Sequence, residues 1–292
     1  MAAPDVTLDE LRPLLFSLAY RMVGSVGEAE DLVQEAFVRL LRSEREVDDA
    51  KAFLTTVVTR LAIDHLRSAR VRRESYVGEW LPEPLVREAA PGPAERAESD
   101  ETLSLAFLTL LERLTPVERA VYVLHDLFGY SHDEIAEFVG KSDANCRQIL
   151  ARARRHVDAG RPRFEPSRRE REALLERFLE AARAGNVAGL VELLAADAVS
   201  YADGGGKVRA TPRPIHGAEK VARLWASIGD PARIGPYTVR VADVNGQPGA
   251  IAIGPDGSVL GVITLQVAGG RVQSVWAVVN PDKLARVQPA ST

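Results

Sequence analysis

The sequence lacks most of the features that would indicate a secreted, membrane-bound or metal-dependent protein. Its 292 residues include 1 cysteine, Cys146, which excludes an internal disulfide and a cluster with zinc-ligand spacing. No apolar run approaches the roughly 20 residues that cross a bilayer. The opening MAAPDVTLDELRP also lacks the basic-then-apolar order of a signal peptide. We therefore expect a cytoplasmic protein with no structural metal and no membrane association.

An excess of positive charge is also missing, since the formal net charge is −4 and the sequence pI is about 5.8. Such a balance is not typical of a DNA-binding protein. The arginines are nevertheless concentrated between residues 147 and 163, where Asp158 is the single acid. Because salt screens charges farther away than about 10 Å, this segment can still attract phosphates. It contains Arg147, Arg152, Arg154, Arg155, Arg161 and Arg163.

The apolar pattern predicts three folded parts and two connections. Helical spacing predicts one helical unit over residues 7–75 and a second over 101–158. Residues 76–100 between them are rich in proline, glycine and acids, which predicts a linker. A second linker covers 159–170, and 171–292 form a further domain. One apolar stripe of the first unit consists of Leu32, Val33, Ala36, Phe37, Leu40 and Leu41.

The last domain combines helical and strand patterns. Helical spacing occurs around Phe178 and again around Trp225, whereas the remainder is rich in valine and isoleucine. Turn signals NG, DG and GG separate the strand-like segments, which predicts an antiparallel meander. We expect an α+β domain with a curved antiparallel sheet, following two all-α domains.

Residues 115–158 carry the start and stop signals of a helix-turn-helix. TPVE at 115–118 and SHDE at 131–134 have the form of capping boxes. Gly140 can end one helix and Ser142 can cap the next. At about 100° per residue, the last helix has two different sides. The apolar side has Cys146, Ile149, Leu150 and Ala153, and the polar side has Arg147, Gln148, Ala151, Arg152 and Arg155.

The polar side of this helix has the chemistry of a major-groove reader. Arginine pairs with guanine, glutamine pairs with adenine, and the small Ala151 leaves room for a thymine methyl group. Arg154 and Arg155 are better suited to phosphates. The alternative is a solvated basic face on an ordinary helical hairpin. Cys146 lies on the apolar side, which favours a small core residue over a redox sensor.

Three segments in this order resemble a bacterial extracytoplasmic-function sigma factor. They are LFSLAYRMVGSVGEAEDLVQEAFVRLLR, AFLTTVVTRLAIDHLRSARVRR and LTPVERAVYVLHDLFGYSHDEIAEFVGKSDANCRQILARAR. The resemblance covers more than half of the chain and implies two all-helical promoter-binding domains. In that family the first domain holds core RNA polymerase and opens the −10 element, and the second binds the −35 element. The implied partners are promoter DNA and core RNA polymerase, with its β′ coiled coil and β subunit.

The resemblance assigns roles to residues of three helices. EAEDLVQEAFVRLL matches the helix that binds the β′ coiled coil, which implies contacts by Asp31, Gln34, Glu35 and Val38; a charged solvent face is the alternative. AFLTTVVTRLAIDHLRSAR matches the −10 reader, which implies contacts by Phe53, Arg60, Arg67, Arg70, Arg72 and Arg73. Many members have tryptophan in place of Phe53, a second aromatic in place of Thr55 and asparagine in place of Arg60. In the −35 helix, Arg147, Gln148, Ala151 and Arg152 match the base-reading positions.

WLPEPL from Trp80, DGGGK from Asp203 and NPDKL from Asn280 narrow the resemblance to the SigJ-type subgroup. Its members carry a fused SnoaL-like domain of the NTF2-like fold, which is thought to regulate sigma activity in cis. We hypothesise that DGGGK contacts WLPEPL or the helical domains, so that the spacing of the two promoter readers depends on the fused domain. A plain hairpin turn is the alternative. The implied regulatory residues are Trp80, Leu81, Pro82, Asp203, Gly204, Gly205, Gly206, Lys207, Asn280, Pro281, Asp282 and Lys283.

A conical sheet closed by helices usually encloses a pocket. Candidates to line it are Tyr201, Asp203, His216, Trp225 and Trp276, and a carboxylate or imidazole there would allow acid–base chemistry. We favour turn and core roles for these residues, because no spacing defines a catalytic pair. We expect a sigma factor that is not an enzyme, with no catalytic residue and no cofactor. The alternatives are a cyclase or isomerase, a sensor of an unknown small ligand, and a repressor that acts without polymerase.

Overall fold

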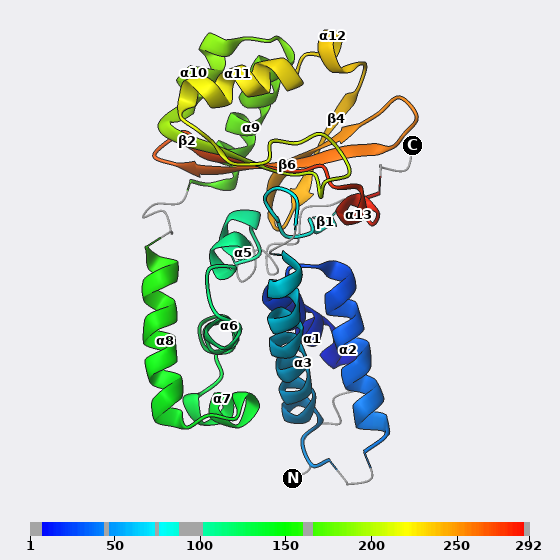
Figure 1. Ribbon diagram of the computed structural model, residues 1–292, viewed down its shortest axis with the longest axis vertical. Coiled ribbons are helices and arrows are strands. Elements are labelled where there is room, and N and C mark those ends of the chain that lie inside the picture. Colours follow the sequence, from blue (N-terminus) through cyan, green and yellow to red (C-terminus); the bar gives the residue numbers. More distant parts are fainter. Residues whose placement is uncertain (1–7, 44–46, 74–75, 88–101, 160–165, 289–292) are drawn as a thin grey trace. The chain divides into compact units, whose positions relative to one another are not determined.

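The computed structural model describes residues 8–43, 47–73, 76–87, 102–159 and 166–288, without the side chains of 70–73. The chain divides into two compact units (Figure 1). Unit 1 comprises residues 1–75 and 108–161, and unit 2 comprises 76–107 and 162–292. The division falls inside helix α5 (Leu105–Leu111). Within the described ranges, no helix has the length and apolar character needed to cross a membrane.

The first part of unit 1 consists of α1 (Leu8–Val23), α2 (Val26–Leu41) and α3 (Ala50–Arg73). The apolar stripes of these helices meet in a core, because residues at helical spacing share one side of each helix. Leu15 and Leu54 in this core are fully buried. One residue of the predicted stripes departs from the pattern. Leu41 is 75% exposed because it lies in the last turn of α2, beyond the packed core.

The second part of unit 1 is the predicted helix-turn-helix. It consists of α6 (Pro116–Tyr122), the π-helical turn η1 (Val123–Leu127), α7 (His132–Val139) and α8 (Asp143–Asp158). Both predicted capping boxes are present, at Thr115 and Ser131. Gly140 ends α7 in the left-handed conformation, and Ser142 caps α8. These local signals therefore form as predicted.

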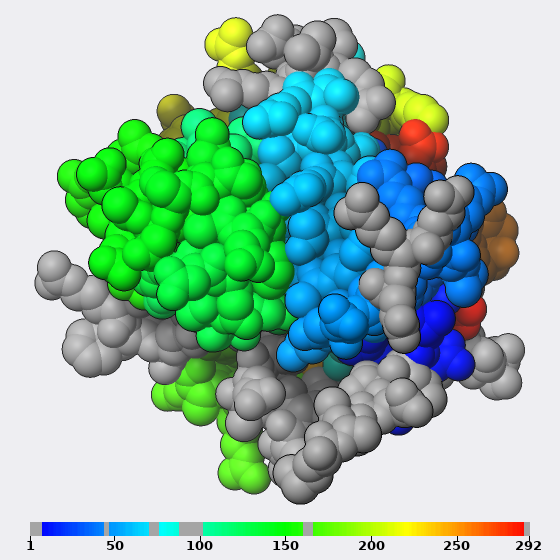
Figure 2. All heavy atoms as spheres, turned by 90° about the horizontal axis from the view of Figure 1, so that it is seen from below, coloured from blue at the N-terminus to red at the C-terminus, as the bar shows by residue number. Residues whose placement is uncertain are grey.

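The helix-turn-helix packs against α3 within unit 1. The Thr55 side chain is fully buried, and its hydroxyl lies 3.2 Å from the Tyr130 hydroxyl. The Arg60 guanidinium donates to the carbonyls of Phe138 at 3.0 Å and Glu137 at 2.9 Å, near the end of α7. In Figure 2 the green residues of the helix-turn-helix adjoin the blue residues of α3 in one continuous surface. The two helical parts therefore form one packed unit.

Unit 2 is built on a seven-stranded sheet with the order β1-β4-β5-β6-β7-β2-β3. Strands β4 to β7 form the predicted antiparallel meander, joined by the NG, DG and GG turns. One pair differs from the expected antiparallel sheet, because β2 runs parallel to β7 and makes the sheet mixed. A parallel pair needs a long connection rather than a hairpin, and β2 enters from a helix. The strands are β1 (Val86–Arg87), β2 (Leu194–Asp203), β3 (Ile215–His216), β4 (Thr238–Val244), β5 (Gln247–Ile253), β6 (Val259–Ala268) and β7 (Arg271–Val278).

Helices cover one face of this sheet. They are α9 (Arg168–Arg183), α10 (Val187–Leu193) and α11 (Ala218–Ile228), followed by the short α12 (Pro231–Ile234). Phe178 and Trp225 meet edge to face in this core, with ring centres 5.4 Å apart. The Trp225 indole also donates to the Ser200 hydroxyl at 3.1 Å, which fixes the ring against β2.

The opposite face of the sheet is covered by chain from the expected linker and by α13 (Pro281–Leu284). Leu81 is fully buried there, Leu105 is 1% exposed, and Val86 of β1 pairs with Val244 of β4. The sequence patterns placed residues 76–100 in a linker and the start of the second helical domain at 101. Residues 76–87 and 102–107 belong to unit 2, because burying their apolar side chains stabilises the docked state. The rest of that linker, 88–100, lies outside the described residues.

Candidate functional site

Helix α8 has one buried side and one exposed side, as predicted. Cys146 and Ala153 are fully buried, and burial raises the pKa of the Cys146 thiol. A raised thiol pKa disfavours the reactive thiolate, which agrees with a core role. The residues predicted to bind the −35 element are all exposed: Arg147, Gln148, Ala151, Arg152, Arg154 and Arg155. The structure therefore places them together on the exposed side of α8, where Arg152 also lies 3.7 Å from the Glu118 carboxylate.

Ion pairs distinguish the arginines of this surface. The Arg154 guanidinium makes two hydrogen bonds to the Asp126 carboxylate, at 2.6 and 2.9 Å. Burial alone would raise the pKa of Asp126, but bonds from Arg154 and His125 hold it below its usual value. Arg154 therefore ties α8 to η1 in addition to any contact with phosphate. Arg147 pairs with Asp143 on its own helix, and such exposed pairs contribute little to stability.

Asn145 is a candidate that the sequence analysis missed. It is exposed one turn before Gln148 and two turns before Arg152, so the three residues share one side of α8. Recognition helices contact base edges mainly through their first turns, and asparagine pairs with adenine. The spacing of polar residues at 145, 148 and 152 was the available signal, but the arginines dominated the pattern.

The predicted −10 residues on α3 do not all lie on a free surface. Phe53 is partly exposed, whereas the Arg60 guanidinium is held by α7 as described above. Arg67 is exposed and pairs with Asp64 at 3.0 Å on its own helix. The side chains of Arg70, Arg72 and Arg73 lie outside the described residues. Arg60 is therefore held by hydrogen bonds to α7, whereas Arg67 has no such contact with α7 among the described residues and remains exposed.

Helix α2 presents the predicted polymerase-binding side to solvent. Asp31, Gln34 and Glu35 are exposed and Val38 is partly exposed. Leu41, which is 75% exposed, lies close to one turn beyond Val38 and extends this side with an apolar position. A single exposed apolar residue is ordinary, so Leu41 extends this side of α2 without by itself marking a partner surface. The sequence pattern missed Leu41 because it placed this residue in the buried stripe.

Asp203 is the centre of a buried polar cluster in unit 2. Its fully buried carboxylate accepts hydrogen bonds from the Tyr76 hydroxyl at 2.6 Å and the Leu81 amide at 2.9 Å. The Lys283 ammonium lies 2.6 Å from the same carboxylate and 4.0 Å from the centre of the Trp80 ring. Burial, followed by the hydrogen bond to Asp203, raises the pKa of Tyr76 above its usual value. The structure therefore brings residues of WLPEPL, DGGGK and NPDKL together.

The glycines of DGGGK are required by conformation and by close approach. Gly205 and Gly206 have φ values of 61° and 71°, which favour glycine. A Cβ atom on Gly205 would clash with the Asn280 amide, and one on Gly206 would lie 3.1 Å from Cβ of Val77. Outside this contact, Lys207 and Asp282 form an exposed ion pair at 2.6 Å. Gly204 is buried, Pro82 is buried, and Pro281 is exposed.

Asn245 also binds the segment between the two helical regions, and the sequence analysis missed it. Its backbone N–H donates to the Leu85 carbonyl at 2.7 Å, and its side-chain oxygen accepts a hydrogen bond from the backbone N–H of Leu85 at 3.0 Å. Its side-chain nitrogen donates to the Leu103 carbonyl at 2.9 Å. The NG pair correctly predicted a turn, but nothing in the sequence indicates what a buried turn contacts. Asn245 therefore holds both described ends of the segment.

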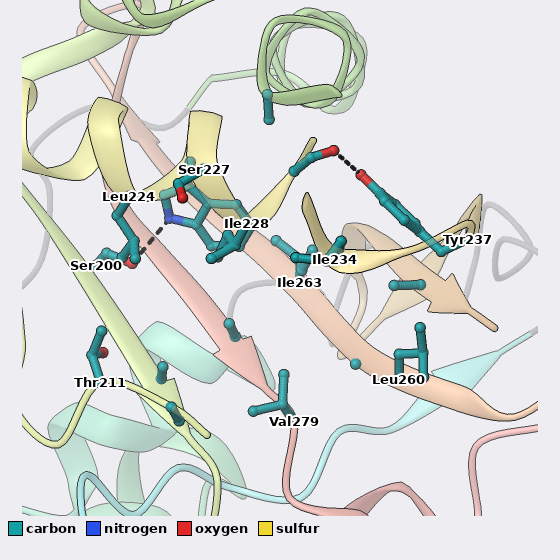
Figure 3. A pocket seen from close by; sticks show the side chains of 18 of the residues that line it. Ser200, Thr211, Leu224, Ser227, Ile228, Ile234, Tyr237, Leu260, Ile263 and Val279 are labelled. Atoms are coloured by element: carbon teal, nitrogen blue, oxygen red, sulfur yellow. Dashed lines mark hydrogen bonds between the residues drawn. The ribbon is translucent and has the colours of Figure 1, made fainter. Parts of the chain in front are cut away.

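A cavity of about 810 Å³ lies on the helix-covered face of the sheet (Figure 3). Of the five candidates to line it, for which we favoured turn and core roles, Trp225 lines the cavity and the others do not. Strand alternation explains the difference, since Ser200 lines the cavity while Tyr201 points to the other face and stacks on Trp276 at 4.1 Å. Asp203 belongs to the buried cluster on that face, and His216 is exposed on β3. No Asp, Glu, His, Lys or Cys lines the cavity, and the described residues contain no group arranged to hold a metal ion.

Comparisons with known proteins cover both units. Residues 8–72 match the family Sigma-70 region 2, and residues 104–157 match Sigma-70, region 4. The ECF RNA polymerase sigma factor SigJ of Mycobacterium tuberculosis is 38% identical over 291 residues, covering 94% of this chain and 91% of its own. The probable ECF RNA polymerase sigma factor SigI of the same organism is 34% identical over 281 residues, covering 94% and 92%. The crystal structure of SigJ matches with a TM-score of 0.76 and 34% identity, covering 96% of this chain and 98% of that one.

Proposed function

This chain belongs to the extracytoplasmic-function RNA polymerase sigma factors, and we propose that its C-terminal α+β domain controls the promoter-binding regions in cis. Sigma factors bind core RNA polymerase and promoter DNA to initiate transcription. The observation that carries the proposal is the docking of the connection between regions 2 and 4 onto unit 2. Asp203, Lys283 and Asn245 hold this connection.

Within this proposal each exposed helix surface has one partner. The side of α2 with Gln34, Val38 and Leu41 binds the β′ coiled coil of core RNA polymerase. The free side of α8, now including Asn145, reads the −35 element, and α3 binds the separated strands of the −10 element. Arg60 reaches those strands after it leaves the carbonyls of α7.

The packing of α3 against α7 is incompatible with binding both promoter elements at once. The −10 and −35 elements are named by their positions along the promoter. They therefore lie about 25 base pairs apart, and this separation is about 85 Å of duplex at about 3.4 Å per base pair. In the structure, Arg60 of α3 instead contacts Phe138 and Glu137 of α7 directly. We therefore interpret this arrangement as a resting state, in which region 4 has to leave region 2 before promoter binding.

Docking of the connection opposes this separation. Residues 76–107 join the two regions, and a fully extended chain of this length reaches about 110 Å. More than half of these residues are held in unit 2 by burial of Leu81 and Leu105 and by the Asp203 cluster. Their docking shortens the reach of the connection. We therefore expect docking to lower transcription and its release to raise it.

An enzymatic C-terminal domain is the alternative function. General acid–base catalysis needs a titratable group of suitable pKa beside the substrate. The titratable residues that line the cavity are arginines and Tyr237, and its lining includes no carboxylate or imidazole. We therefore propose that this domain is not catalytic. Conversion of a substrate by the full chain, abolished by filling the cavity, would contradict this.

Run-off transcription with purified core RNA polymerase tests the proposed control. Gly205→Ala places a methyl group against the Asn280 amide and is expected to raise transcript yield by loosening the connection. Gly269→Ala is the matched control, because its φ of 57° imposes similar backbone strain while nothing lies within 4 Å of the added Cβ. Equal yields from the two variants would refute cis control. Failure of the wild-type chain to bind core enzyme would refute the promoter-binding roles as well.

A further inference from the structure

The cavity in unit 2 exists because small residues occupy the sheet where it faces α11. Ala202, Ala252, Gly261 and Ala277 line its floor, in places where valine or isoleucine would fill the space. Its volume of about 810 Å³ lies within the range of about 300–1,000 Å³ found for small-molecule sites. The walls are mainly aliphatic, with Leu224, Ile228 and Ile263 visible in Figure 3. The site therefore suits a molecule with a large apolar body.

The charged groups of the cavity are of one sign. Arg183, Arg209 and Arg233 line it, and no acidic residue does. Arg233 lies 3.7 Å from the carboxylate of Asp230 and donates to the Ser227 hydroxyl at 3.3 Å. Arg209 forms no ion pair with any residue that the structure describes. Its guanidinium is therefore available to an anionic group of a bound molecule.

The Thr211 hydroxyl adds a second polar position on the loop between β2 and β3, which also carries Arg209. Its oxygen is buried, and it has no hydrogen-bond partner among the described residues. Buried polar atoms are normally satisfied, and a bound molecule or water would supply the partner here. Thr211 is two residues from Arg209, and both line the cavity.

Large apolar side chains at the cavity remain exposed to solvent. Ile228 is 40% exposed, Ile234 is 53% exposed and Leu260 is 45% exposed, and all three line the cavity. Single exposed apolar residues are ordinary, but three at one cavity form a patch that a ligand would cover. We propose that this cavity binds an apolar carboxylic acid, with its hydrocarbon body between the sheet and α11 and its carboxylate at Arg209 and Thr211.

The loop between β2 and β3 also links the cavity to residues 76–107, which join regions 2 and 4. This part of the inference rests on the proposed function. A Cβ atom on Gly204 would lie 2.7 Å from the Val208 carbonyl, so the DGGGK turn packs tightly against the start of the loop. A Cβ atom on Gly78 would lie 3.9 Å from Cα of Pro212, at the other end of the loop. A ligand that orders residues 209–212 would therefore stabilise the docked connection.

Isothermal titration of the full chain with dodecanoate, below its micelle concentration, tests the ligand. We expect binding that Arg209→Gln weakens by about tenfold or more, since one charge-assisted hydrogen bond is lost. Arg223→Gln is the matched control, because Arg223 pairs with Glu219 at 2.9 Å and does not line the cavity. Ala252→Leu, which fills the cavity, is expected to abolish binding. Dodecanol, which has the same chain and no charge, is expected to bind more weakly than dodecanoate.

Absence of binding to the wild type would overturn the ligand assignment, as would equal affinity for dodecanol or unchanged affinity in Ala252→Leu. These results do not depend on transcription and leave cis control to its own test. Hydrogen exchange of the Leu81 amide, which donates to Asp203, tests the coupling. Slower exchange with saturating dodecanoate supports it, and an unchanged rate in a chain that binds dodecanoate overturns it.

Discussion

Replacing Lys283 by methionine tests the contribution of the buried ion pair that fixes the connection to unit 2. The Lys283 side chain is 11% exposed, and the Asp203 side chain that it contacts is fully buried. Methionine keeps the length of the lysine stem and removes the charge, which leaves the Asp203 carboxylate buried without its cation. Breaking one partner of a buried pair costs about 3–5 kcal/mol of unfolding free energy. We expect a loss of this size for Lys283→Met.

Lys207→Met is the matched control. Lys207 and Asp282 also lie 2.6 Å apart, but their side chains are 56% and 64% exposed. Exposed ion pairs contribute about 0–1 kcal/mol because water solvates and screens both charges. The two pairs thus have the same length and differ in burial. We expect the control to stay within about 1 kcal/mol of the wild type.

Urea unfolding followed by tryptophan fluorescence measures this difference. The 3 tryptophans, Trp80, Trp225 and Trp276, all belong to unit 2, so the signal reports that unit alone. In the double variant Asp203→Asn/Lys283→Met no buried charge is left without a partner, so part of the lost stability should return. A loss below about 1 kcal/mol for Lys283→Met, or equal losses for Lys283→Met and Lys207→Met, would refute the reasoning.

Three further predictions concern the promoter-binding surfaces and the docked segment. Arg152→Ala should weaken binding of the −35 element by about 1–3 kcal/mol if Arg152 reads a base, whereas equal loss on every duplex in a binding titration would assign it to phosphate. Arg60→Ala removes two hydrogen bonds to α7 and should speed hydrogen exchange of the α7 amides, while Arg67→Ala, whose partner lies on its own helix, should not. Burial and Asp203 raise the pKa of Tyr76 above 10.0, so its contribution to stability is present below pH 10 and is lost as the pH rises further. Tyr76→Phe should therefore lose less stability than the wild type above pH 10 in urea unfolding, and parallel pH profiles would contradict this.

The local signals in the sequence predicted the helical elements well. The capping boxes at Thr115 and Ser131 and the left-handed Gly140 depend on residues within four positions of each other. The two-sided pattern of α8 depends only on helical geometry, so the buried position of Cys146 followed from its spacing. The NG, DG and GG turns likewise predicted the meander, because turn conformation is a property of the residues in the turn.

The sequence predicted less about the residues that act together in the site. The pattern of α2 placed Leu41 in the core, although the end of a helix can extend past its neighbours and leave an apolar residue exposed. Tyr201 and Trp276 were candidates for the cavity lining, but the alternation of β2 and β7 turns them to the other face, where Trp276 packs in the core. The resemblance pointed to DGGGK, NPDKL and WLPEPL as one functional group, yet it gave no indication of which atoms meet.

What the sequence by itself determined are the elements whose energies are local: caps, turns, helix sides and the basic side of α8. Tertiary structure alone decided that Asp203 faces Lys283 and Leu81, that Arg60 is held by α7, and that residues 76–87 complete a sheet rather than span a gap. Such contacts join residues that are far apart in the chain. Their stability comes from burying charge and apolar surface together, and that burial is set by the packed fold and not by any short pattern.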